Sequence, residues 1–260
     1  MTRFSLLGIN IDLLTMDQLT DLVASSVTHK RQTLIANHNL HSIHLFHNMP
    51  GLPEVYASMD YAHVDGMPLV VIGRSMGLPI CRRHRIAYID WLPLFLPVAA
   101  RNGWRLLYVG SRPGVAERGM ARFRRTIPNL KIKTMHGYFD TDPDSGACRA
   151  AIDEIARYDP DVMFVGMGMP RQEFWITAVR KHVSARAVLT SCGATMEYFA
   201  GDVFTPPRWA GQIGCEWMFR LVTRPSQLWH RYLAEPWSIL PIYLHDLLYA
   251  RPQSTKSASR

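Results

Sequence analysis

One carboxylate stands at a point in this chain where it could act as a base. Asp65 follows the short apolar run Tyr61 to Val64, and Gly66 comes directly after it. Because the run is typical of a buried strand, we expect Asp65 at a strand end beside a flexible turn, where a general base can reach its substrate. A carboxylate in this position also serves as an ordinary turn or capping residue, and the stretch alone leaves both roles open.

Glycines follow several apolar runs farther along the chain. In the stretch 161–173, the run Val162 to Val165 is followed by Gly166 and Gly168 and then by a helix expected from about Gln172. Glycine lets the backbone turn tightly or approach a ligand, and the free amides of a helix N-terminus suit a phosphate. We interpret the stretch as a ligand-binding edge, although an ordinary strand-to-helix connection has the same pattern. Equivalent glycines are Gly110, Gly137 and Gly193.

The elements that position these residues alternate between strand and helix. This alternation predicts an α/β fold, with a Rossmann-like, mostly parallel sheet and flanking helices. Ligands bind beyond the carboxyl ends of the strands in such a sheet, so we expect the glycine loops to line one crevice. The expected strands are Ser5–Ile11, Thr33–Ala36, Tyr61–Val64, Arg105–Val109, Lys131–Met135, Val162–Val165 and Ala187–Ser191.

The chain changes character after Gly201, where two adjacent prolines, at positions 206 and 207, are expected to form a hinge. The residues that follow are rich in arginine and tryptophan, a composition that suits a membrane interface but also allows simple packing on the core. We therefore divide the chain into an α/β domain over residues 1–205, a helical, membrane-facing appendage over 206–250 and a disordered tail over 251–260.

Composition favours an anionic partner. The 260 residues carry a formal net charge of +8, which suits nucleic acid, a phosphorylated small molecule or an anionic membrane surface. The four cysteines form no CxxC pair, so the simplest location is a reducing cytoplasm. No apolar segment reaches the roughly 20 residues needed to span a bilayer. The basic run Arg82-Arg83-His84-Arg85 beside the apolar segment 86–98 is instead a candidate interfacial element.

Several chemistries lack their motifs. The chain has no GxGxxG turn after its first strand, no phosphate-binding GxxxxGK[ST] loop and no GxSxG serine. Four histidines, at positions 38, 41, 44 and 47, are unfavourable for one metal site because three-residue steps drift around a helix. The pairs Asp140/Asp142, Asp142/Asp144 and Asp159/Asp161 lie in turn-forming sequence. What remains is a set of three features: a crevice of backbone amides, one carboxylate and many arginines. This set suits transfer from a nucleotide-activated donor.

Five blocks of the sequence, in order, resemble the WecG/TagA/CpsF glycosyltransferase family over roughly residues 5 to 235. The block that ends in Pro-Arg-Gln-Glu is the most specific. The blocks are His63-Val-Asp-Gly66, Leu107-Tyr-Val-Gly-Ser-Arg-Pro-Gly-Val115, His136-Gly-Tyr-Phe139, Phe164-Val-Gly-Met-Gly-Met-Pro-Arg-Gln-Glu173 and Glu216-Trp-Met-Phe-Arg-Leu221.

The resemblance implies an inverting enzyme that needs no metal or other cofactor. It would transfer a sugar from a UDP-sugar to a polyprenyl-diphosphate-linked saccharide as a peripheral protein on the cytoplasmic face of the inner membrane. Nucleic acid is then not expected as a partner, and a homo-oligomer is left open. Asn37-His-Asn39 and His63-Val-Asp-Gly-Met-Pro68 are most similar to the xanthan-type exopolysaccharide branch, which implies glucose as the donor sugar and a β-1,4-glucosyltransferase. The alternatives are UDP-N-acetylmannosamine or its uronate as donor, and a non-catalytic, membrane-associated nucleotide-sugar-binding protein.

The resemblance also assigns site residues. Asp65 becomes the expected catalytic base, with Asn39 beside it. The residues expected to bind the nucleotide sugar are Asn37, Gly110, Ser111, Gly137, Tyr138, Phe139, Gly166, Met167, Gly168, Gln172, Glu173 and Gly193. Those expected to hold the acceptor diphosphate are Arg85, Arg220, Arg224 and Arg231. The chain departs from the family pattern at Asn37, where threonine is usual, and at Tyr88, where glycine is usual.

Overall fold

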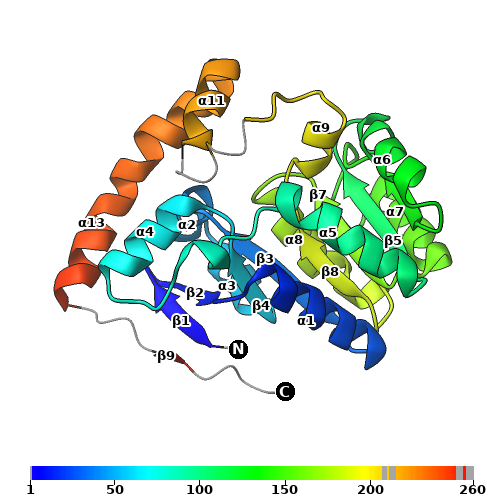
Figure 1. The fold of residues 1–260 in the computed structure, drawn as a ribbon, viewed down its shortest axis with the longest axis horizontal. Coiled ribbons are helices and arrows are strands. Elements are labelled where there is room, and N and C mark those ends of the chain that lie inside the picture. The colour runs from blue at the N-terminus through cyan, green and yellow to red at the C-terminus, as the bar shows by residue number, and fades with distance from the viewer. Residues whose placement is uncertain (1, 207–209, 211–214, 250–253, 256–260) are drawn as a thin grey trace.

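A computed structural model describes residues 2–206, 210, 215–249 and 254–255 (Figure 1). Its centre is a six-stranded parallel sheet in the order β4-β3-β8-β7-β5-β6. Helices cover both faces of this sheet, so the expected α/β fold is confirmed. The strands are β3 (Thr33–His38), β4 (Tyr61–Val64), β5 (Arg105–Gly110), β6 (Lys131–Met135), β7 (Val162–Gly166) and β8 (Val188–Ser191).

Side chains alternate between the two faces of the sheet, as the two-residue period of a strand requires. In β5, Leu106 and Tyr108 pack into one hydrophobic cluster, whereas Leu107 and Val109 pack into the other. The first cluster includes helices α1 (Met16–Thr28), α5 (Tyr88–Arg101), α6 (Val115–Thr126) and α9 (Thr195–Phe199). The second includes α3 (Leu52–Ala57), α7 (Gly146–Tyr158) and α8 (Arg171–Val179), with α2 (Leu40–Asn48) beside them.

The first expected strand is wrong in its form, because residues 3–12 make an antiparallel hairpin. It consists of β1 (Arg3–Leu6) and β2 (Ile9–Asp12). Leu7 and Gly8 make the turn with φ values of 52° and 79°. Two residues of the segment expected to be a disordered tail, Ser254–Thr255, form strand β9 and pair with β1. The rest of residues 251–260 lies outside the described part of the chain.

The apolar segment 86–98 is not an interfacial element. It forms most of α5, and Trp91, Leu92 and Phe95 are at most 1% exposed in the core of the sheet. Among its large apolar side chains, Leu94 faces outward and is 58% exposed. The apolar residues of this segment are therefore buried against the sheet. The neighbouring arginines had suggested an exposed surface instead.

The C-terminal helices form a separate layer beside α2 (Figure 1). They are α11 (Glu216–Thr223), α12 (Pro225–Trp229), the π-helical turn η3 (His230–Ala234) and α13 (Glu235–Tyr249). Ile239 of α13 is buried in a third cluster, with the N-terminal hairpin and α4 (Met67–Ser75). Pro207, Arg208 and Trp209 of the expected hinge and appendage lie outside the described residues. No helix in the described ranges is both long and apolar enough to cross a bilayer.

The glycines at the strand ends come together backbone to backbone. A Cβ on Gly110 would overlap the carbonyl of Gly166, and a Cβ on Gly166 would lie 2.6 Å from the oxygen of Gly193. A Cβ on Gly137 would lie 2.8 Å from the Cα of Gly110. These positions accept only glycine because backbone atoms cannot move aside as a flexible side chain can.

We expect Gly166→Ala to lower the free energy of unfolding by about 3 kcal/mol, the upper end for overpacking, because the clash is with backbone and with the buried Tyr108 ring. Urea denaturation measures the change. Gly146→Ala is the matched control, since a Cβ there meets no atom within 4 Å at the start of α7. Equal stability of the two variants would contradict the close packing.

Candidate functional site

Two connected cavities meet beside Asp65, beyond the carboxyl ends of β3, β4 and β8. The inner cavity, of about 270 Å³, lies over the loops that follow β7 and β8 and includes Gly168 and Gly193. The outer cavity, of about 260 Å³, lies between Met67 of α4 and Trp217 of α11. Both are lined by Asn39, His41, Asp65, Arg220, Arg231 and Tyr232.

The fold holds Asp65 at the end of β4, as expected. Its amide donates a hydrogen bond of 2.9 Å to the carbonyl of His38 at the end of the neighbouring β3. Gly66 then packs on Asn39, where a Cβ would lie 3.3 Å from the Asn39 Cβ. The Asp65 carboxylate itself is half-buried and has no hydrogen bond or ion pair within the described part of the chain. It is therefore available to a substrate in either cavity.

Two asparagines lie at the end of β3, Asn37 within the strand and Asn39 directly after it. Asn37 Nδ2 donates to the carbonyl of Ser191 at 2.9 Å, which fixes the amide and leaves its buried Oδ1 without a hydrogen bond among the described residues. Asn39 caps α2, because its Oδ1 accepts from the amide of Ser42 at 3.1 Å. Asn37 thus has one buried acceptor atom without a partner among the described residues. Asn39 caps a helix in addition to its expected catalytic role.

The first turn of α8 ties two loops together below the inner cavity. Gln172 donates through Nε2 to Glu173 Oε1 at 2.7 Å and accepts through Oε1 from the amide of Gly193 at 3.1 Å. Gln172 lines the inner cavity, whereas Glu173 is fully buried behind it. Burial raises the pKa of Glu173 to about 7. The pair fixes the β8 to α9 turn, so Glu173 supports the cavity without lining it.

The four arginines expected to hold a diphosphate surround the cleft. Arg220 and Arg231 line both cavities. Of these two, Arg85 lines only the outer cavity and Arg224 only the inner one. Arg224 Nη1 lies 3.5 Å from Glu197 Oε2, and the guanidinium of Arg220 lies 5.2 Å from the ring centre of Tyr198. Residues more than 130 positions apart in sequence thus bring positive charge to the two cavities that Asp65 lines.

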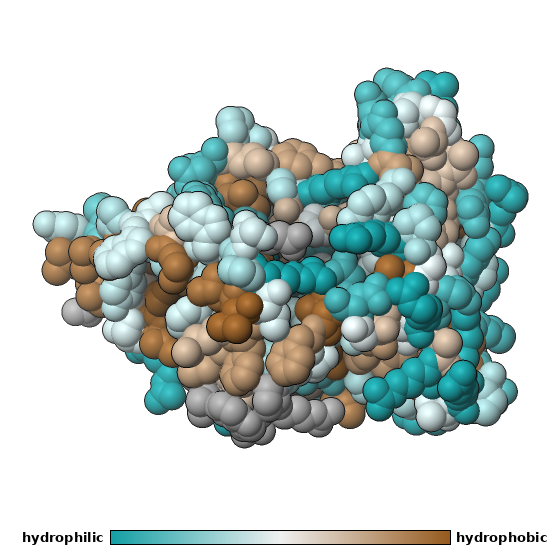
Figure 2. Space-filling model, turned by 90° about the horizontal axis from the view of Figure 1, so that it is seen from above, coloured by the Kyte–Doolittle hydropathy of each residue, from teal (hydrophilic) through white to brown (hydrophobic). Residues whose placement is uncertain are grey.

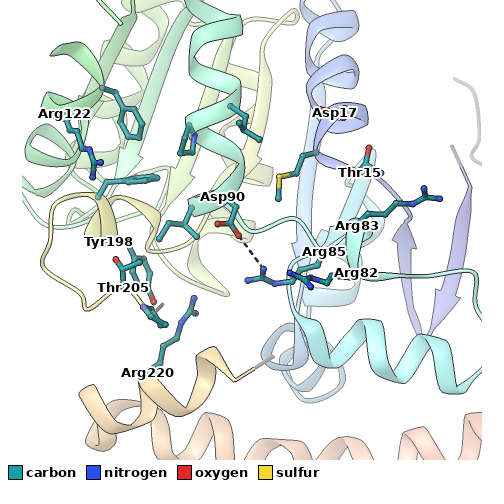
Figure 3. Close-up of a pocket in the computed structure, with 17 residues that line it drawn as sticks. Thr15, Asp17, Arg82, Arg83, Arg85, Asp90, Arg122, Tyr198, Thr205 and Arg220 are labelled. Atoms are coloured by element: carbon teal, nitrogen blue, oxygen red, sulfur yellow. Dashed lines mark hydrogen bonds and ion pairs between the residues drawn. The ribbon is translucent and has the colours of Figure 1, made fainter. Parts of the chain in front are cut away.

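A third, side cavity of about 1120 Å³ opens from the same place (Figure 3). Arg82, Arg83 and Arg85 line it on one side, and Arg122 of α6 lines it on the other. Arg85 also pairs with Asp90 at 3.5 Å, and Arg220 joins this cavity to the other two. The positive charge of the cleft therefore continues onto this part of the surface.

The residues expected to bind the nucleotide sugar are divided by the structure. Asn37, Gly168, Gln172 and Gly193 line the inner cavity. Gly110, Ser111, Gly137 and Gly166 are buried in the close glycine packing, and Met167 packs on the second core cluster. Phe139 lines a different cavity of about 640 Å³ beside α6 and α7, and Tyr138 is 59% exposed. The four glycine loops thus meet, but they do not line one crevice together.

Several residues that line the cavities were not expected to do so from the sequence. Tyr88 lines the inner cavity with its ring, while its hydroxyl meets Thr190 Oγ1 below. Glu197 and Tyr198 of α9 also line it. They follow Gly193 in sequence, so the strand-end rule could have found them. Tyr232 and His41 had no comparable pattern, because their place in the cleft depends on how the C-terminal helices dock.

Each of the four histidines considered for a metal has its own partner. His38 Nδ1 meets Ser42 Oγ at 3.1 Å, and His47 Nε2 meets the carbonyl of Leu7 at 2.8 Å. His41 pairs with Glu235 and His44 with Ser238. The carboxylates of Asp140 and Asp142 accept from backbone amides two residues on. Within the described ranges, no group of three histidine, cysteine, aspartate or glutamate side chains is placed to hold a metal ion.

Comparison with known proteins identifies a family for the chain. A family model described as the glycosyl transferase WecG/TagA/CpsF family matches residues 4–253. A protein of Bacillus spizizenii is 31% identical over 206 residues, which cover 79% of this chain and 77% of the relative. A protein of Bacillus subtilis is 30% identical over 70% of this chain and 68% of its own length. A protein of Staphylococcus aureus is 25% identical over 84% of this chain and 84% of its own length.

These three relatives carry one name, N-acetylglucosaminyldiphosphoundecaprenol N-acetyl-beta-D-mannosaminyltransferase. None of the three is named as a glucosyltransferase, so they give no support to the expected xanthan-type branch. They agree with the broader expectation of a sugar transferase that acts on a polyprenyl-diphosphate-linked sugar. Since the family model spans almost the whole chain, the protein belongs to the WecG/TagA/CpsF family of glycosyl transferases.

Proposed function

We propose that this protein transfers N-acetylmannosamine, or a closely related acetamido sugar, from its UDP derivative to polyprenyl-diphosphate-linked N-acetylglucosamine. The observation that carries the proposal is the Asp65 carboxylate, which has no partner among the described residues and lines two cavities that both contain arginines. The names of the relatives support the acetamido donor over glucose, which was the first expectation from the sequence.

The inner cavity suits the donor sugar and the outer cavity suits the acceptor. The inner one has polar groups that a sugar can meet, such as the Glu197 side chain and the backbone near Gly168. The outer one combines Arg85 and Arg231 with the apolar side chains of Met67, Pro68 and Trp217. Guanidinium groups beside apolar surface fit a lipid diphosphate, because they can bind its oxygens in pairs.

The reaction follows from this placement. Asp65 accepts the proton of the acceptor hydroxyl, whose oxygen attacks the anomeric carbon of the donor from the opposite side. The bond from that carbon to the UDP diphosphate breaks, UDP leaves with the electron pair, and the configuration inverts. Negative charge then grows on the leaving diphosphate, and we assign its neutralisation to Arg220 and Arg224, which line the inner cavity.

The C-terminal helices suit a peripheral position on a membrane. Figure 2 shows hydrophobic surface gathered on the side of the molecule where Figure 1 places α13. Large exposed apolar side chains of these helices include Val222, Trp229, Trp237, Leu248 and Tyr249. A lipid-linked acceptor could enter the outer cavity from this side, which supports the expected position at the cytoplasmic face of the membrane.

A panel of donors tests the proposal. We expect UDP release to be fastest with UDP-N-acetylmannosamine when the protein is incubated with a short-chain N-acetylglucosaminyl-diphosphoryl lipid. UDP-glucose and UDP-N-acetylglucosamine serve as matched donors. Faster release from UDP-glucose would restore the glucose interpretation. Donor binding without release from any of them would favour the non-catalytic nucleotide-sugar-binding protein.

A further inference from the structure

A histidine in the first turn of α2 joins the cleft to the C-terminal helix. His41 Nδ1 lies 2.6 Å from Oε2 of Glu235, the first residue of α13. The Glu235 side chain is 7% exposed and that of His41 is 18% exposed, so water screens their interaction little. A carboxylate on one ring nitrogen fixes the orientation of an imidazole and its neutral tautomer.

The other ring nitrogen of His41 is left for the cleft. His41 lines both the inner and the outer cavity, as Asp65 does. Its Nδ1 is engaged by Glu235, and no hydrogen bond to Nε2 is found among the described residues. In the neutral tautomer that donates from Nδ1, Nε2 is a hydrogen-bond acceptor.

Neighbouring contacts hold α13 against α2 and α4 without reaching the cleft. His44 Nδ1 meets Ser238 Oγ at 2.7 Å, one turn farther along α2, and Tyr243 Oη meets Ser75 Oγ at 2.9 Å. None of these side chains lines the inner or the outer cavity. Docking of α13 alone therefore does not explain why the pair made by His41 and Glu235 is placed beside Asp65.

We propose that His41 is a further catalytic residue, which Glu235 holds as a neutral imidazole so that Nε2 accepts a hydrogen bond from the acceptor saccharide beside Asp65. The inference rests on the proposed function and adds a second acceptor-binding group to it. Because Glu235 belongs to α13, the site is complete only when the C-terminal helix is docked.

The surrounding charges decide how this group responds to pH. Burial lowers the pKa of His41 below its usual 6.5, the cation of Arg231 lowers it further, and Glu235 opposes both. His44 on α2 also faces it and lowers its pKa, while His230 of η3 lies 3.6 Å from the other Glu235 oxygen. His41 is therefore neutral at pH 7 and becomes a cation only as the pH falls through this lowered pKa.

Protonation should reduce activity for two reasons. A protonated Nε2 no longer accepts a hydrogen bond, and a cation beside Asp65 makes that carboxylate a weaker base. We expect kcat/KM for the acceptor to fall as the pH drops through the pKa of His41, which gives the pH profile an acid limb. His41→Gln should lower kcat/KM about tenfold at pH 7.5, the scale of one lost hydrogen bond to substrate, and should remove this acid limb. Glu235→Gln should move the limb to lower pH, because the carboxylate that raises the pKa is gone.

Ser238→Ala and Tyr243→Phe are the matched controls, since they loosen the same helix without touching the cleft, and they should leave the acid limb in place. Nitrogen NMR supplies a readout without turnover: His41 should carry its proton on Nδ1, and a short-chain N-acetylglucosaminyl-diphosphoryl lipid should shift its Nε2 resonance. An unmoved Nε2 resonance, or an unchanged acid limb in His41→Gln, would overturn the assignment. A wild-type protein that binds this lipid at His41 but transfers no sugar would instead overturn the proposed function.

Discussion

Asp65→Asn is expected to lower turnover by about a hundredfold or more, the usual scale for the loss of a general base. The amide has nearly the same shape as the carboxylate, and the backbone hydrogen bond from Asp65 to His38 does not involve the side chain. The variant should therefore fold and bind UDP as the wild type does. Initial rates of UDP release give kcat, and calorimetry gives the affinity for UDP.

Asp90→Asn is a suitable control for this variant. Asp90 is also a half-buried carboxylate near the cleft, but it lines the side cavity and pairs with Arg85. We expect its replacement to change turnover by less than tenfold. If Asp65→Asn keeps turnover within a fewfold of wild type, Asp65 is not the base. Equal losses in the two variants would point to the overall charge of the cleft instead.

Removal of residues 206–260 is expected to abolish transfer to a lipid-linked acceptor while the sheet still folds. The truncation deletes Arg220, Arg224 and Arg231 from the cleft, together with the Glu235 partner of His41. The hydrophobic clusters on the two faces of the sheet contain no residue beyond Phe199, so they stay intact. Circular dichroism measures the fold, UDP release measures transfer, and sedimentation with liposomes measures membrane binding, which should weaken.

The full-length triple variant Arg220→Gln, Arg224→Gln and Arg231→Gln separates loss of charge from loss of the helices. It should also lose transfer, because the diphosphate is no longer neutralised, yet it should keep most of its binding to liposomes. A truncated protein that turns over at the full rate would refute the role of the appendage in the cleft. A truncated protein that unfolds would mean that these helices are part of the core.

The parts of the fold that depend on neighbouring residues could be predicted from the sequence. The strands Tyr61–Val64 and Lys131–Met135 have the expected bounds, because turn-forming residues lie near both ends of each. The hairpin at Leu7 and Gly8 was missed because both residues adopt positive φ within an otherwise apolar run. The segment 86–98 was misplaced because the arginines that precede it suggested a surface, whereas the sheet that buries it is built largely by residues far along the chain.

In the candidate site, too, only the features that depend on neighbouring residues could be predicted. Asp65 and Gly193 follow strands, and the parallel sheet brings such positions to one edge. The sequence does not reveal that Gly110, Gly137 and Gly166 touch one another, since each alone has the pattern of a ligand loop. The spacing of the histidines was noticed, but the partner of His41 lies 194 positions away, and no local pattern connects such residues.

The order in which the cleft is assembled follows from where its walls lie in the chain. All strands of the parallel sheet end by Ser191, whereas Arg220, Arg231 and Glu235 come later. A ribosome adds roughly 5–20 residues per second, and domains fold from the N-terminus during synthesis. The sheet can therefore form on the ribosome before the arginines proposed to hold a lipid diphosphate have emerged. The nascent protein would gain the proposed base, Asp65, first and the proposed binding groups for the membrane-bound substrate later, so transfer would begin only after the C-terminal helices have docked beside α2.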